Sequence, residues 1–469
     1  MTSAPRFVIV GAGPAGVRAA EQLVRAGHRP VVIDEAPRCG GQIYRQPPDG
    51  RRRPARELYG YAAAKAEAVH RAFESLRPSL DHRADTLAWH LEPGVLHLLS
   101  GGVPSVQPFD ALILATGATD RVLPFAGWTL PGVVTLGAAQ VALKAQAVLL
   151  GPRIVFAGSG PLLPLVAWQY ASHGADVAAV LDAAPPGTRR RAAARLLSRP
   201  GLALQGALLL ARLRARGVPY LRGARLVRAH GHGRVEAVEF EAAGRARRID
   251  CDALAVCHGL RSESQLADLA GCAFDFDDTD QAWRPRCTPA GRSSVRGVYL
   301  AGDGAGILGA DAAEASGARA GLSALEDFGS TVPGGDAQRL EAELQVHRRF
   351  RAAVETLSPP PADWAAHTAD DVVVCRCEEI TAGDLRRCVR DTGTGELNRL
   401  KALTRVGMGR CQGRMCGAAA ARVLAHATGR SLADVGRLRG QPPVKPVPIH
   451  AIGAAAPAAT AVPQDQRDD

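Results

Sequence analysis

The sequence predicts an α/β chain with two tandem Rossmann-like dinucleotide-binding domains, the first of them discontinuous, followed by a small α-helical domain with a metal centre. A glycine-rich turn follows a buried strand near residue 11 and again near residue 158, which predicts the paired nucleotide folds. Four cysteines near the end of the chain, at positions 375, 377, 411 and 416, predict the metal centre. A length of 469 residues suits about three domains of roughly 150 residues each.

The composition narrows the possible partners. A hydrophobic content of 46% is enough for sizeable cores. The net charge of +11 suits an acidic partner, anionic lipid or nucleic acid, but charges of both signs are interspersed and only 4% of residues are aromatic. We therefore expect no nucleic-acid partner.

We expect neither a secretory signal nor a transmembrane segment in this chain. Its first residues lack a basic segment, and Phe7–Val10 leads directly into a glycine turn. The most apolar stretch lies at 133–150, where Gln140, Lys144 and Gln146 interrupt it. Ten cysteines, four of them clustered, favour a reduced compartment and a metal site over a disulfide scaffold. We expect a cytoplasmic protein, at most peripheral to the inner membrane through its partners.

The first nucleotide fold is predicted from a strand at 7–10, a glycine turn, a helix at 14–26 and a strand at 31–34. Backbone N–H groups of the turn and the helix dipole would face a pyrophosphate. Asp34 ends the second strand, where it can accept a hydrogen bond from a ribose hydroxyl, and Glu35 is the neighbouring alternative. The predicted dinucleotide-binding residues here are Gly11, Gly13, Pro14, Ala15, Gly16, Asp34 and Glu35.

Three later segments extend this predicted site. Gly41 and Gln42 lie just past the acidic strand end, where a flexible backbone can reach the same phosphates. A buried strand runs from residue 109 into Thr116 and Gly117, and another runs from residue 298 into Gly302 and Asp303, before a helix at 312–326. The Asp303 carboxylate can hold a ribityl hydroxyl, which NAD lacks, and its alternative role is an ordinary helix N-cap.

These two strands are expected to return to the first sheet, which divides the first domain in two. A helix is expected at 336–357, ending before a run of three prolines, and another at 417–428. The predicted division is 1–120 with 270–330 for the first nucleotide domain, 121–269 for the second, 331–364 for a helical linker, 365–432 for the cysteine domain and 441–469 for a disordered tail.

The second nucleotide fold departs from the usual pattern. Gly158 and Gly160 supply the first two glycines of the turn, but Leu163 stands where a third glycine lets helix and strand pack closely. Asp182 ends the following strand, so that any bound nucleotide would be NAD rather than NADP. A working nicotinamide site and a vestigial or different nucleotide site both stay open.

The four cysteines favour an iron–sulfur centre. Zinc sites commonly use two C-x-x-C pairs, whereas Cys375 and Cys377 are separated by one residue, and Cys411 and Cys416 follow after a gap of thirty-three. A 2Fe-2S cluster on these four thiolates fits best, with zinc or no metal as the alternatives. Nearby arginines at 376, 410 and 414 would offset its negative charge.

Residues 6–330 resemble the two-dinucleotide-domain flavoprotein disulfide reductases, in which these segments cradle FAD. No C-x-x-C occurs in the chain, so no dithiol relay is expected. The cysteine segment, with its Cys-Gln-Gly-x-x-Cys ending at 411–416, resembles the helical domain of bacterioferritin-associated ferredoxin. The first resemblance implies FAD on Gly11, Gly13, Gly16, Asp34, Gly41, Gln42, Thr116, Gly117 and Asp303, and the second implies a 2Fe-2S cluster on Cys375, Cys377, Cys411 and Cys416.

The arrangement over residues 6–430 resembles the α (A) subunits of heteromeric, dye-linked amino-acid dehydrogenases, a family that includes opine oxidases, hydroxyproline dehydrogenases and hydrogen cyanide synthase. The resemblance implies that a separate flavoprotein β subunit, with or without a small third subunit, oxidises an amino or imino acid. This chain would receive electrons in pairs on FAD and pass them singly through the cluster. No residue is identified as a substrate base, and the substrate and final acceptor stay open.

Two other functions stay open. One is a self-sufficient NADH-dependent flavin and iron–sulfur oxidoreductase, with hydride entering at the second nucleotide fold. The other is an assembly or regulatory subunit whose cofactors do not turn over.

Overall fold

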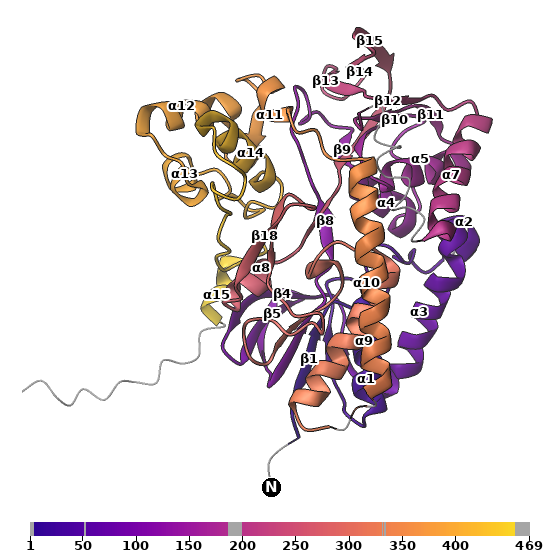
Figure 1. Cartoon of the computed structure of the whole chain (residues 1–469), viewed down its shortest axis with the longest axis vertical. Coiled ribbons are helices and arrows are strands. Elements are labelled where there is room, and N and C mark those ends of the chain that lie inside the picture. Colours follow the sequence, from indigo (N-terminus) through magenta and orange to yellow (C-terminus); the bar gives the residue numbers. More distant parts are fainter. Residues whose placement is uncertain (1–3, 51–52, 186–198, 331, 333, 455–469) are drawn as a thin grey trace, which may run out of the picture.

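The main parts of the fold are two parallel sheets and a helical C-terminal unit (Figure 1). The structure is a computed structural model that describes residues 4–50, 53–185, 199–330, 332 and 334–454. Within these residues each of the two largest sheets has five strands. No described helix combines the length and the apolar character needed to cross a membrane.

The first sheet is assembled from distant parts of the chain. Its strand order is β20-β7-β1-β2-β3, and every neighbouring pair is parallel. The central strands are short apolar runs buried on both faces, as expected for a sheet covered by helices. The strands are β1 (Phe7–Val10), β2 (Val31–Ile33), β3 (Asp81–Arg83), β7 (Ala111–Leu114) and β20 (Val298–Leu300).

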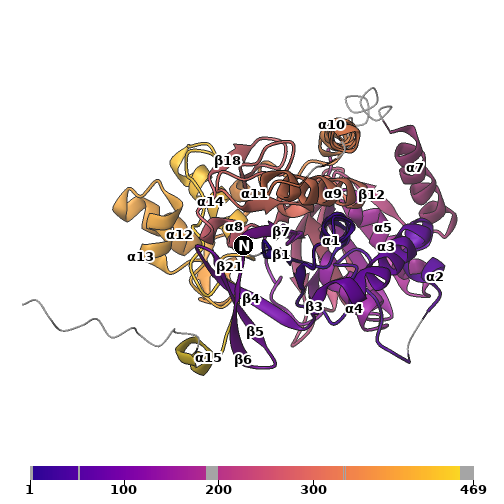
Figure 2. The ribbon, with the colours of Figure 1, turned by 90° about the horizontal axis from the view of Figure 1, so that it is seen from below.

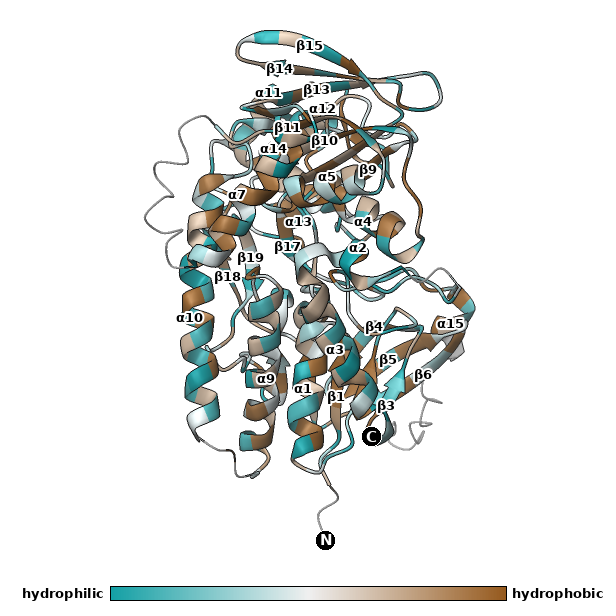
Figure 3. Ribbon diagram, turned by 90° about the vertical axis from the view of Figure 1, so that its right-hand side faces the viewer, coloured by the Kyte–Doolittle hydropathy of each residue, from teal (hydrophilic) through white to brown (hydrophobic). Residues whose placement is uncertain are grey.

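Helices α1 (Pro14–Arg25) and α9 (Ala310–Asp327) pack unusually closely on one face of this sheet. A Cβ added to Gly317 would lie 1.9 Å from the Ala15 carbonyl oxygen, so only glycine allows this approach. Figure 3 shows α10 (Gly334–Leu357), α9, α1 and α3 (Ala63–Leu76) standing side by side, each carrying hydrophobic and hydrophilic residues. The predicted helices at 14–26, 312–326 and 336–357 are thereby confirmed to within two residues at each end.

The second sheet has the order β12-β11-β10-β16-β9, again with parallel neighbours. A three-stranded antiparallel meander, β13-β14-β15, extends from it at the top of Figure 1. The strands are β9 (Val133–Thr135), β10 (Arg153–Ser159), β11 (Asp176–Asp182), β12 (Tyr220–Arg222), β13 (Arg225–His230), β14 (Ala237–Ala242), β15 (Arg245–Asp250) and β16 (Ala253–His258), and the helices are α4 (Leu136–Ala145), α5 (Leu162–Ser172) and α7 (Pro200–Ala215).

The C-terminal unit packs its own apolar core beside the two sheets, on the left in Figure 1. Thr381 and Asp384 form the predicted capping box at the start of α12. Two indoles hold the unit in place, because Trp364 donates to the Pro124 carbonyl (2.9 Å) and Trp128 donates to the Val373 carbonyl (2.7 Å). Its elements are α11 (Trp364–His367), β21 (Val373–Cys375), β22 (Ile380–Thr381), α12 (Ala382–Thr392), α13 (Leu397–Thr404) and α14 (Gly417–Thr428), the last at its predicted position.

The β4-β5-β6 sheet can be seen in the view from below in Figure 2. Shorter elements connect the layers described above. These elements are α2 (Ala55–Tyr59), β4 (Thr86–Glu92), β5 (Val95–Ser100), β6 (Val103–Pro108), β8 (Ala118–Asp120), β17 (Leu260–Ser262), α8 (Gln265–Leu269), β18 (Phe274–Asp277), β19 (Ala282–Pro285) and α15 (Ile449–Ala454), with 3-10 turns η1 (Gly60–Ala62), η2 (Arg77–Ser79) and η3 (Gly302–Gly304).

The segment that starts at residue 441 corrects one expectation. Sequence composition predicted disorder over 441–469, but the described part, up to residue 454, packs against the first nucleotide-type unit. Val444 is fully buried, its N–H donates to the Trp89 carbonyl (2.9 Å), and Lys445 pairs with Glu35. One buried valine and one ion pair order a stretch that has no apolar periodicity, while 455–469 lie outside the described residues.

Candidate functional site

The first glycine turn is shaped by three close backbone contacts. A Cβ on Gly16 would lie 1.7 Å from the Gly11 carbonyl oxygen, and one on Gly11, at φ +107°, would lie 2.3 Å from the Ala115 oxygen. A Cβ on Gly41 would lie 2.9 Å from the Gly13 Cα, which shows that the second glycine-rich segment meets the first. The turn and the N-terminus of α1 are therefore bare backbone, the surface a pyrophosphate requires.

The two acidic residues after β2 have structural partners. The Asp34 carboxylate accepts hydrogen bonds from the N–H groups of Ala12 (2.5 Å) and Ala36 (2.7 Å), and burial raises the pKa of Asp34. Glu35 pairs with Lys445 in the C-terminal segment. Asp34 therefore stabilises the glycine turn through hydrogen bonds, and Glu35 forms an ion pair with the C-terminal segment.

Asp303 lies in η3, directly after β20. Its Oδ1 accepts hydrogen bonds from the N–H groups of Leu308 (2.9 Å) and Gly309 (3.0 Å). The N-cap residue of α9, Gly309, has no side chain with which to cap the helix, and Asp303 bonds the N–H groups of Leu308 and Gly309 rather than those of the first helical turn. Asp303 therefore shapes the loop before α9. Burial raises the pKa of Asp303, as expected for a carboxyl group taken out of water.

A short segment at 262–265 joins this loop to the turn after β7. The Ser262 hydroxyl donates to the Asp303 carbonyl (2.6 Å), and the Thr116 hydroxyl donates to the Glu263 carbonyl (2.5 Å). The structure thus brings together Thr116, Asp303 and this segment. No motif in the sequence pointed to residues 262–265, because their importance depends on contacts between distant parts of the chain.

The second glycine turn is covered by another part of the chain. A Cβ on Gly158 would lie 1.7 Å from the Cys257 carbonyl oxygen, so this turn is as tight as the first. However, the Gly160 N–H donates to the Ser358 hydroxyl (2.7 Å) at the end of α10. The backbone donor that would face a phosphate in such a turn is thus already in use, and the sequence carried no signal for Ser358.

Asp182 at the end of β11 is also occupied within the protein. Its carboxylate accepts hydrogen bonds from the Ala184 N–H (2.9 Å) and the Tyr220 hydroxyl (3.0 Å). The neighbouring Arg222, 3.5 Å from Asp182, donates to the Leu357 carbonyl (3.2 Å) and so holds the end of α10 at this edge of the sheet.

The four cysteines meet at one end of α14. Cys375 ends β21, Cys416 precedes α14, and each has only 1% of its surface exposed. The thiols interact in the order Cys375, Cys416, Cys411, Cys377, so each has at least one other thiol of the quartet as a neighbour.

The surroundings of the quartet lower the pKa of two of its four thiols. The pKa of Cys411 falls to about 5 and that of Cys375 to about 6, chiefly through the side-chain interaction of each with the Cys416 thiol. Backbone N–H groups add to this, from Met415 and Gly413 for Cys411 and from Gly407 for Cys375. The pKa of Cys416, which lies beside both of these sulfurs, rises, and burial raises the pKa of Cys377. Backbone donors aimed at thiolate sulfurs are the outer-shell contacts that metal thiolate centres use.

The cysteine loop is tied to the segment at 262–265. Arg414, inside the loop, forms an ion pair with Glu263 (2.8 Å), and both side chains are largely buried. The Gln265 side-chain amide donates to the Gln412 carbonyl (2.8 Å). One segment of the chain therefore contacts both the first nucleotide-type site and the cysteine loop.

The fold and the glycine turns define a class of protein. The family described as pyridine nucleotide-disulphide oxidoreductase matches residues 5–317, and the chain belongs to that class. A second family model, the sarcosine oxidase A3 domain, matches residues 371–456, the part that holds the cysteines. The prediction of a flavin-dependent oxidoreductase is confirmed.

Within that class, the chain belongs to the family that contains the A subunits of opine oxidases. It is 39% identical to the A subunit of opine oxidase from Rhizobium meliloti over 456 residues, covering 94% of this chain and 85% of that protein. It is 38% identical to the HcnB subunit of hydrogen cyanide synthase from Pseudomonas aeruginosa, covering 95% of this chain and 98% of that protein. These relatives agree with the family resemblance that the sequence motifs indicate.

Among solved structures, L-proline dehydrogenase from P. horikoshii shares the fold. It matches with a TM-score of 0.70 at 21% sequence identity, covering 96% of this chain and 79% of that chain. The match confirms the mixed α/β architecture across nearly the whole chain.

Proposed function

We propose that this chain is the electron-transfer subunit of a heteromeric amino- or imino-acid dehydrogenase, with FAD at the first glycine turn and a 2Fe-2S cluster on the four cysteines. A partner flavoprotein subunit would oxidise a substrate of the opine, hydroxyproline or glycine type. The names of the relatives, which are subunits of opine oxidase and hydrogen cyanide synthase, support a complex. The observation that carries the proposal is the segment at 262–265, which contacts both sites.

The residues around the first turn fit a flavin dinucleotide. The bare backbone of Gly11, Gly13 and Gly41 suits the pyrophosphate, and Pro14, Ala15 and Gly16 open α1 with its dipole toward it. The Asp303 loop, with Gly302, lies beside Thr116 and Gly117, on the path a ribityl chain would take. When bound, the flavin would supply acceptance of two electrons and their release one at a time.

The spacing of the cysteines along the chain suits two iron atoms better than one zinc ion. Zinc sites commonly use C-x-x-C pairs, whereas one residue separates Cys375 from Cys377 and four separate Cys411 from Cys416. Gly409 makes room for the loop, because a Cβ there would lie 2.2 Å from the Cys377 Cβ.

A cysteine exchange with a matched control tests the cluster. Cys411→Ser removes one proposed ligand, whereas Cys388→Ser alters a cysteine on α12 that stands outside the quartet. In protein isolated without oxygen, we expect the first variant to lose most of its iron and the electron paramagnetic resonance signal of the reduced cluster while keeping its flavin. The second variant should keep both. Equal iron in the two variants, or zinc in the native chain, would overturn the cluster assignment.

The alternative is a self-sufficient NADH-dependent oxidoreductase, and the position of Asp182 at the end of β11 is the observation in its favour. Ser358 opposes it, because its hydroxyl takes the Gly160 N–H that a nicotinamide dinucleotide would need. Stopped-flow mixing with NADH separates the two functions. We expect no rapid bleaching of the flavin, and bleaching within the turnover time of the complex would favour the alternative.

A further inference from the structure

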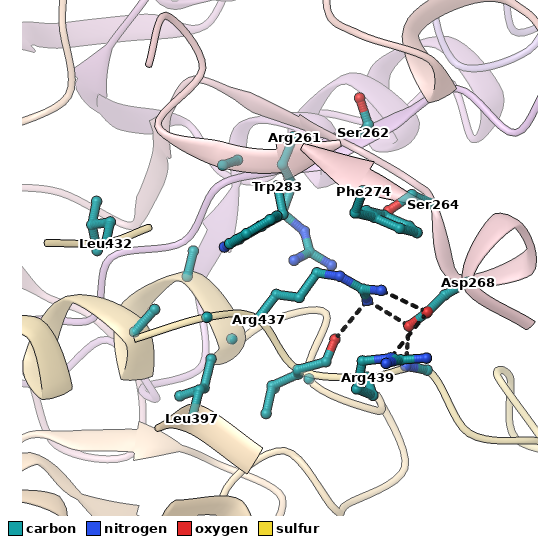
Figure 4. A pocket seen from close by; sticks show the side chains of 18 of the residues that line it. Arg261, Ser262, Ser264, Asp268, Phe274, Trp283, Leu397, Leu432, Arg437 and Arg439 are labelled. Atoms are coloured by element: carbon teal, nitrogen blue, oxygen red, sulfur yellow. Dashed lines mark hydrogen bonds and ion pairs between the residues drawn. The ribbon is translucent and has the colours of Figure 1, made fainter. Parts of the chain in front are cut away.

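A cavity lies where the C-terminal unit meets the rest of the chain, and the segment 262–265 and the cysteine loop at 412–413 contribute to its lining. Its volume is about 130 Å³, comparable to a cavity that holds a single benzene-sized molecule. The hairpin β18–β19 forms one wall with aromatic rings, and α14 and the segment 436–440 form the other (Figure 4). Among the described residues, five arginines line it: Arg121, Arg261, Arg422, Arg437 and Arg439.

Two of these arginines have carboxylate partners, and a third, Arg121, lies near two carboxylates. Arg437 and Arg439 both pair with Asp268, at 2.6 and 3.3 Å. Figure 4 shows Arg437 and Arg439 converging on that carboxylate. Arg121 donates to the Asp280 backbone carbonyl and feels the carboxylates of Asp280 and Glu355, which also pair with Arg351.

Arg422 has no carboxylate partner in the part of the chain that the structure describes, although only 7% of its surface is exposed. Its guanidinium donates to two neutral acceptors, the Gln281 side-chain oxygen (2.9 Å) and the Ala418 carbonyl (3.3 Å). Burial and the like charge of Arg121 lower the pKa of Arg422 to about 9. An uncompensated buried charge is costly, and such charges normally have a counter-ion.

Arg261 shares its acidic neighbour with another arginine. Its Nε donates to the Thr119 hydroxyl (3.3 Å), and the carboxylate that it feels, Glu263, already pairs with Arg414. The cysteine thiolates at 411 and 416 also attract Arg261, so a cluster there would offset part of its charge. The pKa of Arg422, in contrast, shows no attraction by a negatively charged group among the described residues.

His258, the last residue of β16, lies near Arg422 and Arg121 without lining the cavity itself. It is buried, feels the charges of Arg422 and Arg121, and its Nδ1 has no hydrogen-bond partner among the described residues. A buried polar atom without a partner next to an unbalanced arginine is the pattern that a missing polar ligand leaves.

We propose that this cavity binds a small oxyanion, a carboxylate or phosphate group, between the guanidinium groups of Arg422 and Arg261. Planar guanidinium groups bind both kinds of oxyanion through paired hydrogen bonds. Trp283 and Phe274 line the cavity and would contact the apolar part of the ligand. Its volume suits a compound of a few carbon atoms and is too small for a dinucleotide.

The proposal does not depend on the proposed function, because it requires neither electron transfer nor a partner. It adds a third site to the chain, at the junction where the C-terminal unit meets the two sheets. Its ligand would bridge these parts, since Arg422 lies on α14 whereas Arg261 lies on β17.

Isothermal titration calorimetry of the flavin-loaded full chain tests this site with two probes, inorganic phosphate and succinate, and with uncharged succinamide as a blank. We expect one saturable site for at least one oxyanion and none for succinamide. Binding of phosphate alone assigns a phosphate group, binding of succinate alone assigns a carboxylate, and binding of both assigns any small oxyanion. Absence of binding for both probes would overturn the proposal.

Matched variants locate the bound anion. Arg422→Gln should weaken binding by roughly tenfold or more, and Arg422→Lys should weaken it less. Arg390→Gln, on the exposed side of α12, should bind like the native chain. If Arg422→Gln does not fold, Arg261→Gln provides the same test. Native affinity in a folded Arg422 or Arg261 variant would place the anion elsewhere and refute the site.

Discussion

At the scale of single residues, Lys144 shows how the contact between the two nucleotide-type units determines a side chain's chemistry. It lies on α4 with 2% of its surface exposed, and its ammonium group donates to the Ile43 carbonyl (3.0 Å) beside the first glycine turn. Burial lowers the pKa of Lys144 to about 8. The sequence placed this lysine in an apolar stretch but gave no sign of the neighbour it meets.

The lowered pKa predicts a pH-dependent stability. Between pH 8 and 10.5 the unfolded lysine binds a proton that the folded one has lost, so the free energy of unfolding rises with pH across this range. We expect urea unfolding of the native chain to gain on the order of 2 to 3 kcal/mol more than Lys144→Met between pH 7 and pH 10. Parallel pH profiles for the two proteins would contradict this account.

A glycine exchange tests the first nucleotide site at the same scale. In Gly13→Ala the new Cβ lies 3.5 Å from the Gly41 Cα, an ordinary contact, so the fold should survive while the methyl group fills space beside the pyrophosphate. We expect FAD affinity to fall by roughly tenfold or more. Gly206→Ala on α7, where a Cβ meets nothing within 4 Å, is the control and should keep native flavin content. Equal flavin content in both variants would remove the pyrophosphate from this turn.

At the scale of elements, the segment at 262–265 and the end of α10 determine which parts of the chain contact each glycine turn. The first joins the Asp303 loop to the cysteine loop, and the second covers the turn after β10 through Ser358. Both are tertiary contacts between segments far apart in sequence. The contacts of residues 262–265 connect the first site to the cysteine loop, which is the connection that the proposed electron transfer requires.

The ion pair between Glu263 and Arg414 has a measurable contribution. Glu263→Gln leaves a largely buried guanidinium without its carboxylate, and the free energy of unfolding should fall by on the order of 2 to 4 kcal/mol. Glu241→Gln breaks the exposed pair with Arg225 on the meander and should change stability by less than about 1 kcal/mol. Similar losses in the two variants would mean that the buried pair does not anchor the cysteine loop.

The elements themselves were largely readable from the sequence, whereas their contacts were not. Apolar runs bounded by glycine located β1, β7, β10 and β20, and the capping box located α12, because these signals are local. Ser358 and Glu263 lack such signals, since each matters through a partner more than a hundred residues away. Disorder was predicted from residue 441 onward because the segment has no apolar periodicity. The described part is ordered instead, and a single buried side chain, Val444, holds it in place.

At the scale of the whole molecule, the chain joins two nucleotide-type folds to a cysteine-bearing unit through a small number of buried polar contacts. Family membership, with 39% identity to the A subunit of an opine oxidase, defines an oxidoreductase. The geometry adds that residues 262–265 link one nucleotide fold to the cysteine loop, whereas Ser358 contacts the glycine turn of the other fold. The proposed electron transfer between two cofactors requires a link of the first kind.

Flash photoreduction of the chain, loaded with FAD and iron under anaerobic conditions, tests the central claim most directly. The flavin absorbance and the cluster signal would be followed together after the flash. We predict that the reduced flavin loses one electron at the rate at which the cluster gains one, and that Glu263→Gln slows both changes equally. A flavin that stays reduced beside an oxidised cluster, or a chain that holds no iron, would contradict the account.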